Sequence, residues 1–520
     1  MARRAQPVAL SLAAGLAGAA IAALVLGTLA AVALRAEAPG GLARADWRAA
    51  GFTLMQATLS AALSCLLAVP LARALSRRRF PGRGAAITAL GAPFLLPVAV
   101  AVFGLLALFG RNGLANAALT GLGLPPLDIY GLTGILLAHV FFNLPLATRF
   151  LLHGWSAIPP ETFRLAASLD LSDRALFRTV ELPMLRAVLP GAFVSVFLLC
   201  LTSFAVVLAL GGGPKATTIE LAIYEAFRFE FDLSRAALLA LVQLGIGLAA
   251  AVLALTVPQP EPGRGLELVA RRWDGRGWRR AADAALIVLA LVFLAAPILV
   301  VAGRGGAALA TLPDGLLGPT LRTLAVALSA TALTFCLAMP LALRIGAGRA
   351  SAAGRGAELI GALPLAASPL ILGTGLFVLL NSFLDPVSLS LPITALVNAM
   401  MALPFALRAL IPAAVEAHQR FDRLSDSLDL PFRTRLRHVI LPRMRQPLGF
   451  SLGLAAALSA GDLGVLALFS TPDQATLPLA IYAMMSAYRT DAAAAAGLIL
   501  IALAFGLFLL FDKGIGRARA

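Results

Sequence analysis

Charged residues are scarce in this chain of 520 residues, because Asp, Glu, Lys and Arg together make up only 13% of it. Soluble globular proteins carry about 25% of such residues. Hydrophobic residues reach 60% and gather in long uninterrupted runs. A soluble globular protein is therefore excluded. The composition predicts an all-α membrane protein that crosses the bilayer many times.

Lysine and cysteine are also rare. Lysine occurs only at Lys215 and Lys513, so the net charge of +16 comes almost entirely from arginine. The arginines lie in short segments between apolar runs, as the positive-inside rule predicts, and this placement argues against nucleic-acid binding. The cysteines show no pair or metal-ligand spacing, and we expect all three to be buried small hydrophobic residues. They are Cys65, Cys200 and Cys336.

Recognisable catalytic motifs are missing as well. No His, Asp and Glu cluster has metal-ligand spacing, and no G-x-S-x-G nucleophile motif occurs. The glycines before Lys215 lack the spacing of a phosphate-binding loop, so we interpret them as a tight turn. We therefore expect no catalytic residue, no metal site and no cofactor in this chain.

Apolar runs long enough to span a bilayer occur twelve times. The first run, which reaches about residue 34, is too long for a signal peptide and is expected to be a retained helix. Arginine-dense segments follow the second, fourth, sixth and twelfth runs and precede the first. All of these segments fall on one face, which predicts a cytoplasmic location for both termini. The predicted spans are 9–34, 50–75, 86–110, 129–152, 187–211, 235–257, 283–303, 319–344, 357–381, 389–413, 446–469 and 491–512.

The two halves of the chain repeat one another. The segments 164–186 and 423–445 share 12 of 23 residues. Leu221-Ala-Ile-Tyr224 also recurs as Leu479-Ala-Ile-Tyr482. Six spans in each half give both copies the same orientation, so the halves are predicted to be parallel repeats. The predicted organisation is a first repeat at 1–257, a cytoplasmic linker at 258–282 and a second repeat at 283–520, with polar loops at 155–186 and 416–445.

The polar loop of the first repeat has the pattern of a short amphipathic helix, a turn and a second helix. Pro159-Pro160-Glu161-Thr162 is typical of a helix start. Leu165, Leu169 and Leu176 form an apolar stripe. The turn is expected at 170–173, and Leu182-Pro183 is expected to end the segment before the next span. Such a helix could simply lie in the lipid interface. The duplication favours a docking element for a symmetric partner.

Both loops resemble the EAA signature of bacterial ABC-importer permeases. The signature aligns on the Leu-Pro pair of each loop, and Arg164 and Arg423 replace its Glu while Asp170 and Asp429 replace its Gly. Aspartate tolerates the left-handed conformation better than most residues, so the bend is expected to persist. The resemblance implies that these segments couple the chain to ATPase subunits. The candidate coupling residues are Arg164, Leu165, Ala166, Leu169, Asp170, Leu182, Pro183, Arg423, Leu424, Leu428, Asp429, Leu441 and Pro442.

Over nearly its whole length, the chain resembles the fused double permeases of thiamine ABC transporters. The resemblance is carried by the segments 210–224 and 459–465 and by Thr476-Leu-Pro. It implies a type I importer permease in the bacterial inner membrane that imports thiamine, with its phosphate esters as further candidates, by alternating access. The implied partners are two copies of an ABC ATPase, which binds the ATP, and a periplasmic substrate-binding protein.

Three alternatives stay open. Fused ferric-iron permeases share the length, the duplication and similar segments. An ion-coupled secondary transporter would need paired ionisable residues at mid-membrane, and only Asp462 and His139 are candidates. A membrane enzyme would need one of the missing motifs.

The candidate substrate-path residues are Asp462, Asn143 and His139. Asp462 interrupts an apolar run between two glycines, and a carboxylate there would suit the permanent positive charge of thiamine. The alternative for Asp462 is a polar residue that packs helices. His139, Asn143 and Asn398 are each expected to make an interhelical hydrogen bond rather than a substrate contact.

Overall fold

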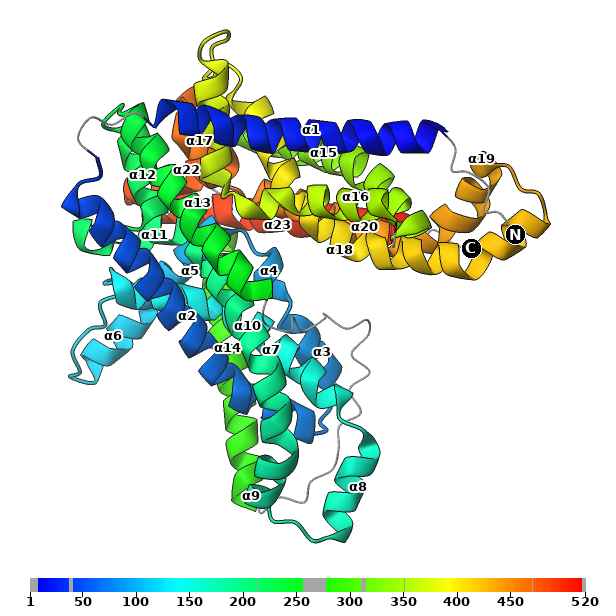
Figure 1. Cartoon of the computed structure of the whole chain (residues 1–520). Helices are drawn as coiled ribbons and strands as arrows, with labels where there is room; N and C mark the ends of the chain where they lie inside the picture. The colour runs from blue at the N-terminus through cyan, green and yellow to red at the C-terminus, as the bar shows by residue number, and fades with distance from the viewer. Residues whose placement is uncertain are drawn as a thin grey trace.

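The computed structural model of the chain describes residues 8–36, 41–211, 213–255, 277–309, 315–349, 351–469 and 471–516. Every regular element in these ranges is a helix, which confirms the predicted all-α class (Figure 1). The apolar runs adopt helices because a lipid-exposed backbone must satisfy its own hydrogen bonds.

The helices of the first repeat are α1 (Val8–Arg35), α2 (Arg44–Arg77), α3 (Arg83–Ala89), α4 (Ala92–Leu95), α5 (Val98–Phe109), α6 (Leu114–Gly121), α7 (Leu132–Ala157), α8 (Pro160–Ser168), α9 (Asp173–Leu176), η1 (Phe177–Glu181), α10 (Leu182–Leu201), α11 (Ala205–Leu210), η2 (Pro214–Ala216), α12 (Ile219–Arg228) and α13 (Leu233–Leu255).

The helices of the second repeat are α14 (Gly277–Ala308), α15 (Leu317–Gly348), α16 (Ala352–Ala362), η4 (Leu363–Ala366), α17 (Pro369–Leu380), α18 (Ser390–Ser427), α19 (Phe432–Arg435), η5 (Leu436–Ile440), α20 (Leu441–Ala460), α21 (Gly464–Phe469), η6 (Pro472–Gln474), α22 (Leu477–Ser486) and α23 (Thr490–Gly516).

Eleven stretches of the described chain are long and apolar enough to cross a membrane, and the bent pair α16–α17 makes a twelfth. The predicted span 357–381 is this bent pair, whose two helices meet at 92°. The predicted span 86–110 is also wrong as one helix, since the chain there forms α3, α4 and α5. Pro93, Pro97 and Pro369 stand at these breaks, because proline lacks the N–H that a continuing helix needs.

Two further predicted spans are interrupted at equivalent places. The run 187–211 breaks between α10 and α11, and the run 446–469 breaks between α20 and α21. At the end of α10, Gln56 Nε2 donates to the Cys200 carbonyl at 2.9 Å, and Gln243 Nε2 donates to the Leu201 carbonyl at 3.1 Å. These amides satisfy helix-end carbonyls that would otherwise lack partners.

The repeats exchange their first helices. α1 packs on α15, α16 and α17 of the second repeat as well as on α13 of its own, whereas α14 packs on α2 and α5 of the first repeat as well as on α23 of its own. Figure 1 shows two lobes that diverge from a common junction. We call α2, α7, α10 and α14 the first lobe, and α1, α15, α18 and α20 the second lobe. The junction contains α5, α11, α12, α17, α21 and α22. The sequence repeats and the packing units therefore differ.

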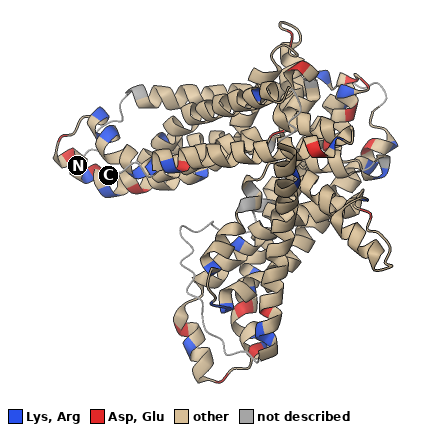
Figure 2. Ribbon diagram, turned by 180° about the vertical axis from the view of Figure 1, so that it is seen from behind, with Lys and Arg blue, Asp and Glu red and all other residues tan. Residues whose placement is uncertain are grey.

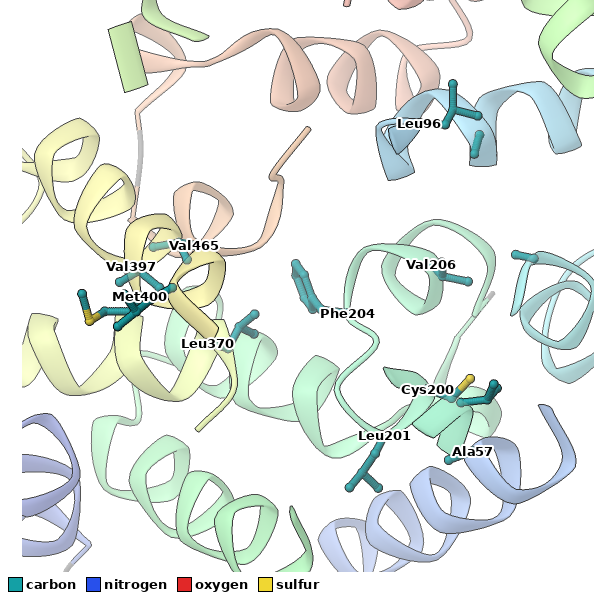
Figure 3. Close-up of a cluster of buried hydrophobic side chains, with 14 of the residues drawn as sticks. Ala57, Leu96, Cys200, Leu201, Phe204, Val206, Leu370, Val397, Met400 and Val465 are labelled. Atoms are coloured by element: carbon teal, nitrogen blue, oxygen red, sulfur yellow. The ribbon is translucent and has the colours of Figure 1, made fainter. Parts of the chain in front are cut away.

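Apolar side chains from both repeats fill the junction (Figure 3). Phe204 of the first repeat and Leu370 of the second are buried there, near the backbone of Gly464. A Cβ on Gly464 would meet Leu370 Cδ1 at 3.3 Å and Phe204 Cδ1 at 3.7 Å. The absence of a side chain at this glycine lets the repeats approach closely.

Two smaller predictions need correction. Most of the predicted linker, residues 258–276, lies outside the described residues, but 277–282 form the first turns of α14 instead of a loop. Cys65 and Cys200 are buried as expected, whereas Cys336 is exposed. Cys336 lies on α15 with its side chain directed away from the packed core, where an apolar residue can face lipid.

Candidate functional site

The two polar loops lie at the tips of the two lobes (Figure 1). The first tip is built by α8, α9 and η1, and the second by the end of α18, by α19 and by η5. Figure 2 shows acidic and basic residues at both tips. Two chemically similar surfaces are thus presented far from the junction.

A left-handed aspartate ends the first helical segment of each loop. Asp170 has φ 45° and Asp429 has φ 49°. The N–H of Leu171 donates to the Ala166 carbonyl at 3.1 Å, and the N–H of Leu430 donates to the Ser425 carbonyl at 3.0 Å. This is the Schellman arrangement, which usually places glycine at the left-handed position. The bend therefore forms with aspartate at the place where the signature has glycine.

The same leucines are exposed in both copies. Exposed fractions are 60% for Leu165 and 61% for Leu169, and 54% for Leu424 and 60% for Leu428. Members of each pair are four residues apart and lie on one helix face. Exposed pairs of large apolar side chains beside exposed arginines form a surface suited to a partner protein.

The third leucine of the predicted stripe does not belong to this face. Leu176 is buried with Phe163 and Ala166 in a small apolar cluster inside the first loop. Ser425 is buried at the position equivalent to Ala166. The prediction failed because the turn at 170–172 reverses the chain, so helical spacing across it carries no meaning. Each loop therefore has an inward face and an outward leucine pair.

The loops differ in how they leave the preceding span. In the first repeat α7 ends at Ala157, and α8 begins after Pro159. In the second repeat α18 continues without a break to Ser427, so the second loop has no separate first helix. Proline disfavours a helical conformation in the residue before it. His418 occupies the position equivalent to Pro159 and allows the helix to continue.

The Leu-Pro pair does not end either loop, contrary to the prediction. One continuous helical stretch runs from Asp173 to Leu201, and Leu182-Pro183 lies inside it. A π-helical turn precedes each pair, in which Leu182 N–H donates to the Phe177 carbonyl and Leu441 N–H donates to the Leu436 carbonyl. Proline has no N–H to donate, and its ring would clash with a carbonyl of an ordinary α-helical turn. The wider π-helical turn accommodates both features.

Different side chains anchor the two loops. In the first loop, Arg73 Nε donates to Glu181 Oε2 at 2.6 Å, and Arg73 lies over the Phe177 ring. Arg279 of α14 pairs with Asp173. In the second loop, Arg435 pairs with Asp422, and His418 Nδ1 lies 3.0 Å from the same carboxylate. A common backbone shape is thus supported by separate sets of contacts.

His139 and Asn143 lie together in the core of the first lobe. His139 Nδ1 is 2.8 Å from Ser60 Oγ, and its Nε2 is 2.9 Å from Ser203 Oγ. Asn143 Nδ2 donates to Cys200 Sγ at 3.3 Å. Both residues therefore join α7 to neighbouring helices in this structure. In the second lobe, Asn398 Nδ2 similarly donates to Ser459 Oγ at 3.0 Å.

Asp462 lies in the second repeat, in the break between α20 and α21. Its Oδ1 accepts a hydrogen bond from Gly464 N at 3.2 Å, while its buried Oδ2 has no hydrogen-bond partner among the described residues. Pro97 of the first repeat packs against the adjacent Gly461. The structure therefore places Asp462 at the junction, apart from the pair formed by His139 and Asn143. Asp462 therefore accepts a hydrogen bond at the start of α21, and its other carboxyl oxygen has no hydrogen-bond partner among the described residues.

The sequence reasoning missed another buried acid, Glu220 on α12. Its side chain is completely buried, and neither carboxyl oxygen has a hydrogen-bond partner in the described part of the chain. The available signal was an acid within the apolar run Ile219–Phe227. It was overlooked because that run is shorter than a membrane span.

Curated relatives match almost the whole chain. The thiamine transport system permease protein ThiP of Brucella abortus (strain 2308) is 40% identical over 525 residues, covering 98% of this chain and 96% of its own length. ThiP of Escherichia coli (strain K12) is 40% identical over 497 residues, covering 91% of this chain and 89% of its own. This chain belongs to the ThiP family of permeases. No family model matches the chain.

A shorter relative matches part of this ThiP-family chain. The molybdenum transport system permease protein ModB of Azotobacter vinelandii is 30% identical over 186 residues. These residues cover 82% of ModB but only 35% of this chain. A stretch shorter than one repeat therefore corresponds to most of a separate permease. Together with the many apolar helices, these similarities establish a multi-pass membrane permease.

Proposed function

We propose that this ThiP-family chain is the membrane-spanning subunit of an ATP-driven importer of thiamine in the bacterial inner membrane. Phosphate esters of thiamine are further candidate substrates. The observation that carries the proposal is the paired exposed leucines, set in the same Schellman bend at both lobe tips. The substrate assignment is supported by the ThiP relatives at 40% identity over nearly the full chain.

Two ABC ATPase subunits would each dock on one lobe tip, with both chain termini on the same cytoplasmic side. ATP would bind to these subunits, and the permease itself would need no cofactor. Closure of the ATPases would draw the tips together, and the lobes would then close on one side of the junction and open on the other. A periplasmic binding protein would deliver thiamine to the opposite end.

The direct test is uptake of labelled thiamine by a thiamine-requiring strain that lacks its own importer. The strain should grow on low thiamine only when it carries this chain, its ATPase and its binding protein. An ATPase variant unable to hydrolyse ATP is the control and should abolish uptake. Failure to rescue growth, together with rescue of an iron-uptake defect, would replace thiamine by ferric iron as the substrate. Uptake that persists with the inactive ATPase would instead indicate ion-coupled transport.

A further inference from the structure

Glu220 is a buried acid at the junction of the two repeats, and neither the coupling loops nor the predicted path uses it. It lies in the first turn of α12, with 0% of its surface exposed. Burying a carboxyl group without hydrogen bonds is costly, so such a group calls for an explanation. The residues around Glu220 indicate which kind of ligand would offset this cost.

Oxygen atoms from both repeats gather around this carboxyl group. Gln243 of α13 lies beside it, and the Gln243 Oε1 atom also lacks a hydrogen-bond partner among the described residues. Ser368, the N-cap of α17 in the second repeat, lies on another side of the carboxyl group. Glu220 is the only acid among these three residues, and a carboxylate suits a positively charged ligand with N–H donors.

Aromatic rings continue the same surface. Tyr224 lies one helical turn after Glu220, and its ring centroid is 5.3 Å from that of Phe204. Phe227 follows on this face, and its ring lies 4.7 Å from Phe377 of α17. An acid beside aromatic faces is the arrangement that binds organic cations, through charge pairing and cation–π attraction.

The second repeat lacks this acid. The shared Leu-Ala-Ile-Tyr segments align Glu220 with Pro478 and Tyr224 with Tyr482. Tyr482 lines a small pocket whose other lining residues are apolar, namely Ala99, Val102, Ala205, Ala209, Leu463 and Met485. The two repeats therefore differ at this position, as the binding of a single asymmetric ligand would require. The second repeat has no acid at the position equivalent to Glu220.

We propose that Glu220, Gln243 and Tyr224 bind the positively charged part of the transported substrate at the junction. The inference rests on the proposed function and adds the residues that would recognise the cation. Because Glu220 is fully buried, the site is closed in this structure. Separation of α12 from α17, which belong to different repeats, would uncover it.

The test is thiamine uptake into proteoliposomes that contain the complete complex and receive thiamine-loaded binding protein. Glu220→Gln keeps the size and hydrogen-bonding capacity of the side chain but removes its charge. Glu225→Gln is the matched control, because Glu225 is a partly exposed acid on the same helix. We expect Glu220→Gln to lower uptake at sub-saturating thiamine at least tenfold, with complex assembly unchanged. Glu225→Gln should stay within twofold of wild type.

Each other outcome has a defined meaning. Wild-type complex that does not transport thiamine would refute the proposed function and this inference with it. Wild-type transport with equal uptake by Glu220→Gln and Glu225→Gln would overturn the inference alone. If the complex with Glu220→Gln does not assemble, uptake is measured with Glu220→Asp instead, because this variant retains the charge on a shorter side chain. A raised KM for Glu220→Asp would support the inference. An unchanged KM, or failure of both variants to assemble, would assign Glu220 a structural role.

Discussion

Four leucine side chains provide the apolar area at the lobe tips. Leu169 and Leu428 occupy equivalent positions, and both are well exposed. Burying one leucine side chain stabilises a contact by about 1.5–3 kcal/mol. Leu169→Asp or Leu428→Asp should therefore weaken ATPase binding at least tenfold and lower transport, while membrane insertion persists. Co-purification of the ATPase with each variant measures this.

The control for the leucine variants is Leu124→Asp, because Leu124 is an exposed leucine outside both coupling loops. It should leave ATPase binding unchanged. If both tip variants bind the ATPase and transport as well as wild type, these leucines have no docking role.

The left-handed aspartates give a second residue-scale prediction. Asp170→Gly should leave stability nearly unchanged, because glycine adopts φ 45° without strain but loses more entropy on folding. Asp170→Val should destabilise the loop by about 1–2 kcal/mol, because a β-branched residue is strained at this φ. Thermal unfolding of the purified chain, together with ATPase binding, measures both effects. A valine variant indistinguishable from the glycine variant would show that the bend is not required.

Asp462 gives a third prediction at this scale. Asp462→Asn keeps an oxygen that can accept from Gly464 N, so the complex should assemble. We expect thiamine uptake to fall, because the counter-charge at the junction is lost. Asp462→Leu also removes the hydrogen bond to Gly464 N, which contributes about 1 kcal/mol, and should lower the yield of folded protein. If the asparagine variant transports normally while the leucine variant folds poorly, Asp462 only packs and caps helices.

At the scale of elements, α14 connects the first loop to the junction. It begins beside the first polar loop, where Arg279 pairs with Asp173, and it packs along α2, α5 and α23. Arg78 Nε donates to Asp283 Oδ2 at 2.7 Å, and Arg77 contacts the other oxygen at 3.3 Å. These ion pairs hold the exchanged helix to the first lobe.

Asp283→Asn should loosen this attachment. Hydrogen bonds to charged groups contribute about 1.5–3 kcal/mol, and the substitution leaves two partly buried arginines without their counter-ion. We expect a lower unfolding temperature of the detergent-purified chain. Asp491→Asn, which changes an exposed acid in the first turn of α23, should not alter it. Equal unfolding temperatures for both variants would show that α14 is held by apolar packing alone.

At the scale of the whole molecule, the two lobe tips predict the stoichiometry of the complex. One copy of this chain should bind two ATPase subunits, because it presents an equivalent exposed leucine pair at each tip. Native mass spectrometry of the purified complex measures the ratio. The single variant Leu428→Asp should yield a complex with one ATPase. A wild-type complex with two copies of this chain, or with a single ATPase, would refute the assignment of one site to each tip.

The membrane class and the duplicated loop could be predicted from the residues alone. Apolar runs of membrane length can only be helices in lipid, and 12 identical residues in 23 identify the repeated loop. The left-handed bend at Asp170 was also predictable, because few residue types tolerate that conformation. These features depend on residues that are neighbours in the chain, so they can be read from the sequence.

Tertiary structure alone decided the rest. Sequence spacing could not show that Leu176 is buried while Leu169 is exposed, because the turn between them changes the direction of the chain. Nor could it show that α1 and α14 exchange lobes, since each helix is apolar enough to pack on either repeat. The sequence also could not show that Ser368 of the second repeat lies beside Glu220 of the first, because only the packing of the two repeats brings these residues together.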